Sequence, residues 1–477
     1  MGQIIMTAQE PWPSEENFIG DIRVILSGGT CRIDWGDGAD LLYEADGKEL
    51  HVQHTYLKKN PETEETYVIK IYSDEENITG IYAKCGNLDV KDIDISRCRS
   101  LRYFAPLSAM HFDLRTNPEL TKVDIEGDFY ENADFSNSQN LKELSINFTY
   151  ARGIDLSNCS RLEKFKCTAV LEPVKTTLPK YFPLKEFTFD ESILWCFTKR
   201  QLKKIVSVIE HNGGKMVNAL MLREYPHSEF FLQPEQTQNH PAKSCHHMRE
   251  QIKMDISPFR EGYIACIAVL LDDGPCEIDW GDRHKSRLEA KGREWLYGVH
   301  VYSQSISRQV TITSEAGKII GLIAENLSSL NGVAIDSIDI SRCPSLRYFA
   351  ADGMSHLNVG TNPELQIIDL SNCYCTSIDF SNSTGLEHLY IGTGLGGPNP
   401  KVQSLDLAKC KRLQTLGIRH STDLNNITIA GDSPLMQFTC DDYTPLNEAA
   451  VRNLQQVIAR NGGQFTKITR EDEENNL

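Results

Sequence analysis

The residues best suited to chemistry gather in a few places along the 477-residue chain. The stretch NHPAKSCHH brings together His240, Cys245, His246 and His247. Thiolate and imidazole groups are zinc ligands, and the same cluster could supply a nucleophilic thiol to a hydrolase or thiol enzyme. One cysteine beside histidines, without a second spaced pair, is a weak metal signal. We therefore expect no cofactor, no metal and no catalytic residue, and keep the enzyme as an alternative.

A second group of acids lies in the turn DWGDGAD, which contains Asp34, Asp37 and Asp40. Clustered carboxylates suit a hard cation such as calcium. The spacing is not that of an EF-hand, however, and the second DWGD, which begins at Asp279, has lost one of the three acids. We expect these carboxylates to bond the turn amides and Trp35 to pack into a core.

A third group of acids forms a regular column. Its members are Asp94, Asp113, Asp134 and Asp155, matched later in the chain by Asp339, Asn358, Asp379 and Asp406. If neighbouring segments pair as strands, these side chains stack about 5 Å apart. They could be solvated carboxylates that bond turns, or they could bind a cation or a basic partner. Asn358 interrupts the column, which favours the first interpretation.

The elements that position these residues repeat at two scales. A shift of 245 residues superposes CRIDWGDG at Cys31 on CEIDWGDR at Cys276, and IDISRC at Ile93 on IDISRC at Ile338. After an insertion around residues 392–400, the match resumes and reaches the HNGG and RNGG segments. This pattern indicates a tandem duplication of a whole module.

Within each copy a shorter period of about 21 residues recurs. A leucine follows each aspartate of the first column by seven positions, giving Leu101, Leu120, Leu141 and Leu162. Such a period is typical of a leucine-rich repeat, in which stacked coils share one core. We expect these leucines to point inward. Cys98, Cys159, Cys343 and Cys410 occupy one fixed place in the repeat, which indicates small buried thiols, with disulfides or metal binding as alternatives.

Each coil also has a second strand, of the form L-x-x-L-x-I, whose outward residues differ from coil to coil. Scaffold positions meet the same packing demand in every coil, so the varying face is the better candidate for recognition. Because aromatic and arginine side chains dominate binding energy, the predicted contacts in the second copy are Tyr348, Asp352, His388, Tyr390, Arg419 and Asp441. In the first copy they are Lys122, Glu143, Lys164 and Lys166.

A helix is predicted to close the repeats at the end of each copy. Asn447 is a plausible N-cap, Leu454, Val457 and Ile458 fall with Val451 on one helical face, and Gly462 can end the helix in the left-handed conformation. The segment TKRQLKKIVSVIEHNGG occupies the same place in the first copy.

The segments before the repeats alternate apolar and polar residues, which predicts a small β-sandwich. Their CRIDWGDG, HTY at His54 and TYVIKI at Thr66 resemble the W-x-F-G-D-G signature and later strands of PKD-type immunoglobulin-like domains. Together with the repeats, the module resembles bacterial leucine-rich-repeat proteins with a WGDG-bearing β-domain. That resemblance implies an interaction or surface protein and places the recognition strand where the variable face lies.

The predicted fold is therefore mainly β with capping helices: two copies of a small PKD/Ig-like β-sandwich followed by a short leucine-rich-repeat solenoid. The expected boundaries are 1–77 and 78–225 for the first copy, 226–250 for a linker, and 251–315 and 316–477 for the second copy.

Bulk properties narrow the partners. A net charge of −17 argues against nucleic-acid binding, which needs a basic stripe, and no apolar run is long enough to span a membrane. The N-terminus has no export signal, which predicts the cytoplasm unless a leader has been removed from a cell-surface protein. We expect a non-enzymatic recognition protein with a protein ligand or, second, a glycan. The alternatives are an enzyme that uses Cys245, His246 and His247 or a cleft between the copies, and an architectural spacer.

Overall fold

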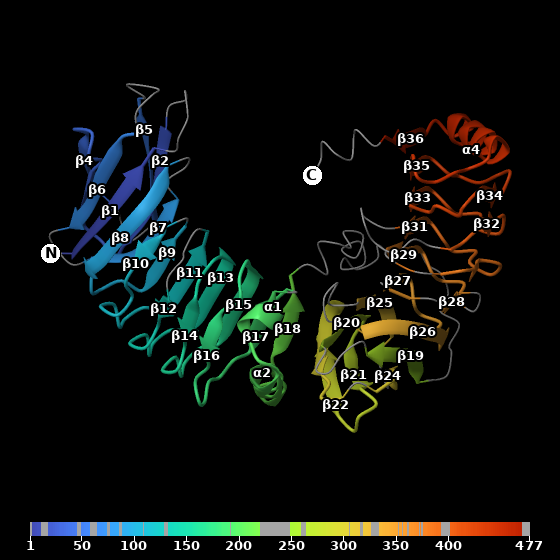
Figure 1. Cartoon of the computed structure of the whole chain (residues 1–477), viewed down its shortest axis with the longest axis horizontal. Coiled ribbons are helices and arrows are strands. Elements are labelled where there is room, and N and C mark those ends of the chain that lie inside the picture. The colour runs from blue at the N-terminus through green and yellow to red at the C-terminus, as the bar shows by residue number, and fades with distance from the viewer. Residues whose placement is uncertain are drawn as a thin grey trace. The chain divides into compact units, whose positions relative to one another are not determined.

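The computed structural model describes residues 2–10, 18–44, 49–57, 64–73, 77–84, 88–107, 109–127, 132–190, 192–219, 249–258, 264–304, 306–314, 318–325, 333–351, 353–354, 356–359, 362–371, 373, 375–392 and 401–469. The chain forms two compact units, unit 1 (Met1–Ala219) and unit 2 (Leu220–Leu477) (Figure 1). Nearly all of the predicted linker lies outside the described residues.

Unit 1 begins with strands that pair antiparallel in two sheets. They are β1 (Gly2–Gln9), β2 (Phe18–Leu26), β3 (Thr30–Asp34), β4 (Asp40–Glu44), β5 (Glu49–Tyr56), β6 (Thr66–Ser73), β7 (Ile78–Lys84) and β8 (Asp89–Arg97). The pairs β2–β5 and β2–β7 belong to one sheet, and β1–β6, β1–β8, β3–β4 and β3–β6 belong to the other. Buried and partly exposed residues alternate along β1, as expected of a strand with one face on a core.

Both sheets continue into the repeats. The repeat strands are β9 (Tyr103–Pro106), β10 (His111–Phe112), β11 (Lys122–Glu126), β12 (Asn132–Asp134), β13 (Glu143–Thr149), β14 (Gly153–Asp155), β15 (Lys164–Val170), β16 (Lys175–Thr177), β17 (Glu186–Phe189) and β18 (Lys215–Asn218). β7 pairs antiparallel with β2 and parallel with β9, so one long sheet has the order β18-β17-β15-β13-β11-β9-β7-β2-β5. β8 similarly joins β1 to β10, and β12, β14 and β16 form a short parallel sheet.

Unit 2 repeats this topology. Its strands are β19 (Glu250–Pro258), β20 (Ile264–Leu271), β21 (Gly274–Asp279), β22 (Lys285–Ala290), β23 (Glu294–Val301), β24 (Arg308–Ser314), β25 (Ile319–Glu325), β26 (Val333–Arg342), β27 (Tyr348–Ala351), β28 (His356–Asn358), β29 (Ile367–Ser371), β30 (Ile378–Asp379), β31 (His388–Gly392), β32 (Ser404–Leu407), β33 (Thr415–Arg419), β34 (Asn426–Ile429), β35 (Gln437–Asp441) and β36 (Gln464–Ile468). The long sheet has the order β23-β20-β25-β27-β29-β31-β33-β35-β36. β22-β21-β24-β19-β26-β28-β30 and β32-β34 form the other sheets.

The core lies between the sheets of each unit. The repeat leucines Leu101, Leu120, Leu141 and Leu162 are fully buried, which confirms the inward orientation predicted for them. Burial of each leucine contributes roughly 1.5–3 kcal/mol to folding. In unit 2 one hydrophobic core runs from Ile252 to Ile458, so the N-terminal strands and the repeats share one interior.

Asparagine side chains close the bends between coils. Asn117 is buried and its Nδ2 donates to the carbonyls of Ile95 (3.1 Å) and Cys98 (2.7 Å). Asn362 makes the same pair of bonds in unit 2, at 3.0 and 2.9 Å. A buried carbonyl without a partner destabilises a fold, so this position selects a residue that can donate.

The predicted helices are present near the end of each unit. α2 (Lys199–His211) follows the short α1 (Ile193–Cys196) and starts with a capping box between Thr198 and Gln201. α4 (Glu448–Arg460) has Asn447 as its N-cap, and Gly462 follows it with φ +70°, as predicted. Neither helix is the last element, because β18 and β36 follow them and join the edge of the long sheets (Figure 1).

The WGD turns are built by carboxylate-to-amide bonds. Asp34 Oδ1 accepts the N–H of Gly36, and Asp37 Oδ1 accepts the N–H of Ala39, both at 3.0 Å. Gly36 has φ +80°, and a Cβ there would lie 2.8 Å from the backbone of Val68, so the turn requires glycine. These bonds agree with the structural interpretation of the DWGD acids.

An aromatic cluster anchors each WGD turn. Trp35 is buried, the His54 ring stacks on it at 4.9 Å, and the Tyr56 hydroxyl donates to the Trp35 carbonyl at 2.9 Å. His54 Nε2 lies 2.7 Å from Asp37 Oδ2. In unit 2 the same contacts join Trp280 to His300 and Tyr302, and His300 to Asp282.

The described residues are mainly in strands, which confirms the mainly β prediction. Among them, no helix has the length and apolar character required to cross a membrane.

Candidate functional site

The outward face of each long sheet, opposite the core, carries the residues predicted to make contacts. Parallel pairing aligns its side chains in rows across the strands. In unit 1 the first row contains Tyr103, Lys122, Glu143, Lys164, Glu186 and Lys215. In unit 2 the corresponding row contains Tyr348, Ile367, His388, Thr415, Gln437 and Gln464.

In unit 1 this row alternates in charge and the charges pair with one another. Lys164 Nζ lies 2.9 Å from Glu143 Oε1. Lys122 Nζ lies 3.5 Å from Asp124 Oδ2 and 5.1 Å from the ring centroid of Tyr103. The structure therefore places Lys122, Glu143 and Lys164 on the predicted face, but each already has a partner of opposite charge within the chain. A ligand would have to compete with these pairs.

The rest of the face in unit 1 is also polar. Lys166 is half-buried in the second row, beside the strands that carry the ion pairs. On β2 and β5, Asp21 Oδ1 lies 2.7 Å from His51 Nε2, and Arg23 Nη1 lies 3.4 Å from Glu49 Oε1. The outward face of unit 1 is thus lined with compensated charges from its antiparallel strands through its repeats.

In unit 2 the first strands of the same face are apolar and buried. Cys266, Ala268 and Tyr297 occupy the places of Asp21, Arg23 and His51 in unit 1, and all three are buried. The rings of Trp295 and Tyr348 meet edge to face at 5.7 Å.

Tyr348 is 0% exposed, so the expectation that it is an exposed contact residue is wrong. Its position on the outward side of β27 was predicted correctly, but the outward side is covered at this point. Burial raises the pKa of the Tyr348 hydroxyl well above its usual value.

The accessible part of the face in unit 2 begins at β31. His388 and Tyr390 lie two residues apart on this strand and are half-buried, and Arg419 on neighbouring β33 is exposed. A Cβ on Gly417 would lie 2.8 Å from Tyr390 Cδ1, so the tyrosine ring rests against the glycine backbone. The structure thus brings three of the predicted residues together on adjacent strands.

Burial shifts the pKa values of His388 and Tyr390. It lowers the pKa of His388, which favours the neutral imidazole. Burial, reinforced by the Asp369 carboxylate, raises the pKa of Tyr390 to about 12, so this side chain is a neutral phenol at physiological pH. An aromatic phenol beside a neutral imidazole favours contact through apolar surface and hydrogen bonds.

Asp441 does not face a partner. It is 0% exposed, and its carboxylate accepts the N–H of His420 (2.5 Å), the N–H of Tyr443 (3.2 Å) and the hydroxyl of Thr444 (2.9 Å). His420 has φ +49°, and its ring stacks on Tyr443 at 4.7 Å, with Nδ1 3.2 Å from Asp441. The expectation of an exposed contact is wrong, because the buried Asp441 carboxylate bonds the backbone of His420, a residue in the left-handed conformation. We call this arrangement a brace: a buried carboxylate that accepts the N–H of a left-handed residue on the preceding coil.

Unit 1 has the same brace, but its left-handed residue is an alanine instead of a histidine. Asp190 accepts the N–H of Ala169, which also has φ +49°, and the N–H of Ser192 at 2.9 Å. The common element is the buried carboxylate, so the His420–Asp441 pair is a variant of a structural brace. Sequence reasoning missed Ala169 and His420, although the alignment of Asp190 with Asp441 was the available signal.

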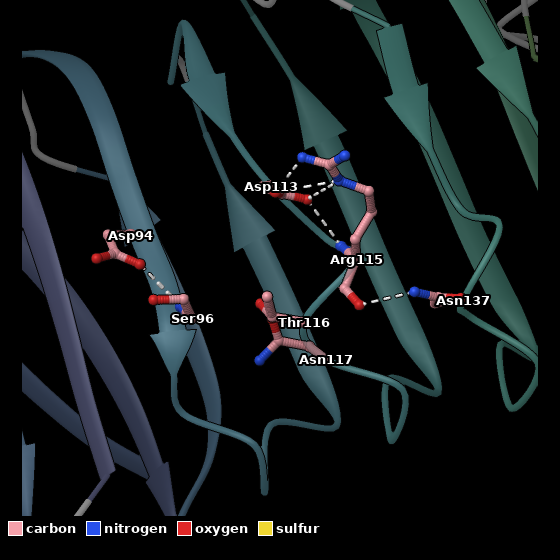
Figure 2. Close-up of polar contacts among 7 residues, drawn as sticks. All are labelled: Asp94, Ser96, Asp113, Arg115, Thr116, Asn117 and Asn137. Carbon is pink, nitrogen blue, oxygen red and sulfur yellow. Dashed lines mark hydrogen bonds and ion pairs between the residues drawn. The ribbon is translucent and has the colours of Figure 1, made fainter.

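The carboxylates of the aspartate column bond the backbone of the turns that follow them. Asp94 accepts the N–H of Ser96, and Asp113 accepts the N–H of Arg115, both at 2.9 Å (Figure 2). The same bond recurs for Asp134, Asp155, Asp339, Asp379 and Asp406. The Arg115 guanidinium lies 2.8 Å from Asp113 and lowers the pKa of that carboxyl. Across the described residues, no group of histidine, cysteine and acidic side chains is arranged to hold a metal ion.

Several predicted residues belong to segments that the structure does not describe. Asp352 and the cluster of His240, Cys245, His246 and His247 lie outside the described residues, as does most of the insertion, residues 393–400. The hypotheses that rest on them stay predictions.

No protein-family model and no curated protein matches the chain. Among solved structures, the functional domain of InlJ from Listeria monocytogenes, which includes a cysteine ladder, aligns with 13% sequence identity and a TM-score of 0.30, over 82% of this chain and 68% of that one. A likeness at this TM-score carries no argument about fold or function.

Proposed function

We propose that the protein is a non-enzymatic recognition protein that binds a protein ligand through the outward face of the long sheet in unit 2. We also propose that each unit is a leucine-rich-repeat solenoid headed by a PKD-like β layer. The contact residues in this proposal are His388, Tyr390 and Arg419.

Two features support the assignment of the repeat. The parallel strands pair in register at the period read from the sequence, for example Lys122 with Glu143 and Glu143 with Lys164. The buried Asn117 and Asn362 bond the bend of the preceding coil. The WGD turn, with its buried tryptophan and the bond from a following tyrosine, supports the PKD-like layer.

One observation carries the functional proposal. At matching register, unit 1 has Glu143 and Ser145 where unit 2 has His388 and Tyr390. The backbone is the same, so packing of the core does not dictate which side chain stands there. Rigidly held aromatic side chains on a sheet supply binding energy with little loss of conformational entropy. In unit 1 the same place is occupied by a glutamate already paired with Lys164.

The test exchanges these residues between the units. The full chain would be used to capture partners from a cell extract, beside a variant that carries His388→Glu and Tyr390→Ser, the residues that unit 1 tolerates at the same positions. A partner that binds the parent chain at least tenfold better than this variant supports the proposal. A ligand that is lost after deglycosylation of the extract is a glycan and contradicts a protein partner.

The matched control carries Glu143→His and Ser145→Tyr in unit 1. It should keep the partner with unchanged affinity, and all three chains should have the same melting temperature. Equal affinity of the parent and the unit 2 variant would exclude this face as the binding site.

A further inference from the structure

Unit 1 contains a pair of thiols in direct contact. Cys167 Sγ on β15 and Cys196 Sγ at the end of α1 are 3.3 Å apart, and both side chains are buried. The two cysteines are 29 positions apart in the sequence. Cys196 precedes Phe197 and the N-cap Thr198, and residues 193–211, which hold α1 and α2, are called the capping segment. The pair therefore lies where the capping segment meets the long sheet.

We propose that Cys167 and Cys196 are a site of covalent modification: they form an intramolecular disulfide when the chain folds in the presence of a small-molecule or protein disulfide. One thiolate attacks the oxidant and expels one thiol, which gives a mixed disulfide. The second thiolate then attacks the mixed disulfide and expels the second thiol. The chain loses two hydrogens, and the oxidant is reduced to two thiols.

The geometry needs little change for this bond. A disulfide requires a sulfur separation of about 2.05 Å, so the sulfurs must approach by about 1.3 Å, a movement within the reach of side-chain torsions. The neighbouring packing holds both residues in place. The Phe197 ring meets those of Phe165 and Phe187 edge to face, at 5.9 and 5.8 Å.

The same surroundings determine when the bond forms. The contact with Cys196, together with burial, raises the pKa of the Cys167 thiol well above its usual value, which suppresses the reactive thiolate. The folded, reduced protein therefore oxidises slowly. The disulfide forms during folding, before the capping segment covers the thiols.

This pair has no counterpart at the same positions in unit 2. Alignment of the capping segments puts Pro445 at the position of Cys196, and Ile418 stands at that of Cys167. Unit 2 has a different thiol pair, Cys373 and Cys375, in which a hydrogen bond with Cys373 lowers the pKa of the Cys375 thiol, and whose Sγ atoms also contact the carbonyls of Ala351 (3.1 Å) and Met354 (3.6 Å), outside the capping segment. Oxidation should thus tie down the capping segment of unit 1 alone.

The experiment refolds the full chain from denaturant in a glutathione/glutathione disulfide buffer and, separately, in dithiothreitol. Remaining thiols are alkylated before unreduced tryptic digestion. Each cysteine of the pair falls in its own tryptic peptide, residues 167–175 and 186–199. The expected product is one cross-linked species of these two peptides. The melting temperature of unit 1 should rise by roughly 5–10 °C because the cross-link restricts the unfolded chain.

Two variants keep the test interpretable. Cys196→Ala should abolish both the cross-link and the oxidation-dependent rise. Cys159→Ala removes another buried thiol of unit 1 and should retain both. Recovery of Cys167 and Cys196 in alkylated form after oxidative refolding, or cross-linking of either one to other cysteines in comparable yield, would overturn the proposal.

Discussion

The long sheets of the two units hold corresponding residues at the same register and give them opposite surroundings. In unit 1, Asp21 on β2 is partly exposed and meets His51 across the strand pair. In unit 2, Cys266 and Tyr297 stand at these positions and are buried. One scaffold thus accommodates a charged, self-paired face and an apolar, covered face, so the outward residues of these strands vary without a change in the pairing of the sheet.

The apolar face can be recognised in the sequence of its strands. β20 reads IACIAVLL where β2 reads FIGDIRVIL, and β23 reads EWLYGVHV where β5 reads ELHVQHTY. A strand buried on both faces has a nearly continuous apolar run, whereas a strand with one solvent-exposed face alternates apolar and polar residues. The difference between the units is therefore a difference in how many faces of the sheet are removed from water.

The largest effect is expected from transfer of a charge onto the buried face. Cys266→Asp places in unit 2 the carboxylate that unit 1 carries as Asp21, but without the histidine that meets it there. Burial of an unpaired charge should lower the free energy of unfolding of unit 2 by about 3 kcal/mol or more, measured by urea unfolding.

The reciprocal variant Asp21→Cys removes contacts with His51 and Gln53 at a partly exposed site, so its expected effect is about 1 kcal/mol or less. The double variant Cys266→Asp with Tyr297→His should recover part of the loss, because it restores the partner. If Cys266→Asp is as stable as the parent chain, the outward face of unit 2 is not buried in solution.

A smaller effect, shared by both units, is expected at the WGD turns. Although burial acts to raise it, the pKa of Asp37 is held below its usual value by the bonds from His54 and the Ala39 amide. The unfolded chain thus binds this proton more readily than the folded chain. The stabilisation is complete above the ordinary carboxyl pKa, about 4, and is lost as the pH falls below it. Asp282 behaves in the same way in unit 2.

Asp37→Asn should lower the stability of unit 1 at pH 7 by about 1 kcal/mol and should reduce its further loss between pH 5 and pH 3. Asp282→Asn is the matched variant for unit 2. Urea unfolding at several pH values measures both, and an acid profile unchanged by the substitution would exclude the carboxylate–histidine bond as its source.

The smallest effect is expected at the braced left-handed residues. Ala169→Gly relieves an unfavourable φ of +49° and should raise the stability of unit 1 by up to about 1 kcal/mol. His420→Gly relieves the same strain but removes the ring that stacks on Tyr443, so the gain should be absent or reversed. Thermal melts of the two variants measure how much the imidazole contributes. An equal gain in both would mean that it contributes nothing.

Much of the scaffold could be predicted because its signals are local or periodic. The inward leucines follow from a period that must match the stacking of coils, and Asn117 follows from the need for a donor at the bend. Asn447 and Gly462 follow from helix-end chemistry. The strands β18 and β36 were not predicted, because short segments after a helix carry no period and pair only with a sheet edge built by distant residues.

The outward residues were predicted only in part for a related reason. Alternation along a strand gives the side of the sheet that a residue faces, so Tyr348 and Tyr390 were both placed outward. Whether that side is exposed to solvent depends on what packs against it. Tyr348 is buried, whereas Tyr390 is half-buried. Asp441 was misjudged because its role depends on a left-handed residue one coil earlier, a relation that exists only after the coils stack.

The sequence alone determined the recurrence of its motifs, the period, the inward residues, the caps and the mainly β class, because each of these follows from side-chain chemistry repeated at fixed spacing. Only the tertiary structure decided the continuity of the sheets, the burial of one outward face, the braces at Asp190 and Asp441 and the contact between Cys167 and Cys196. These features depend on atoms brought together from distant coils, and burial, strain and sulfur contact are properties of that assembly.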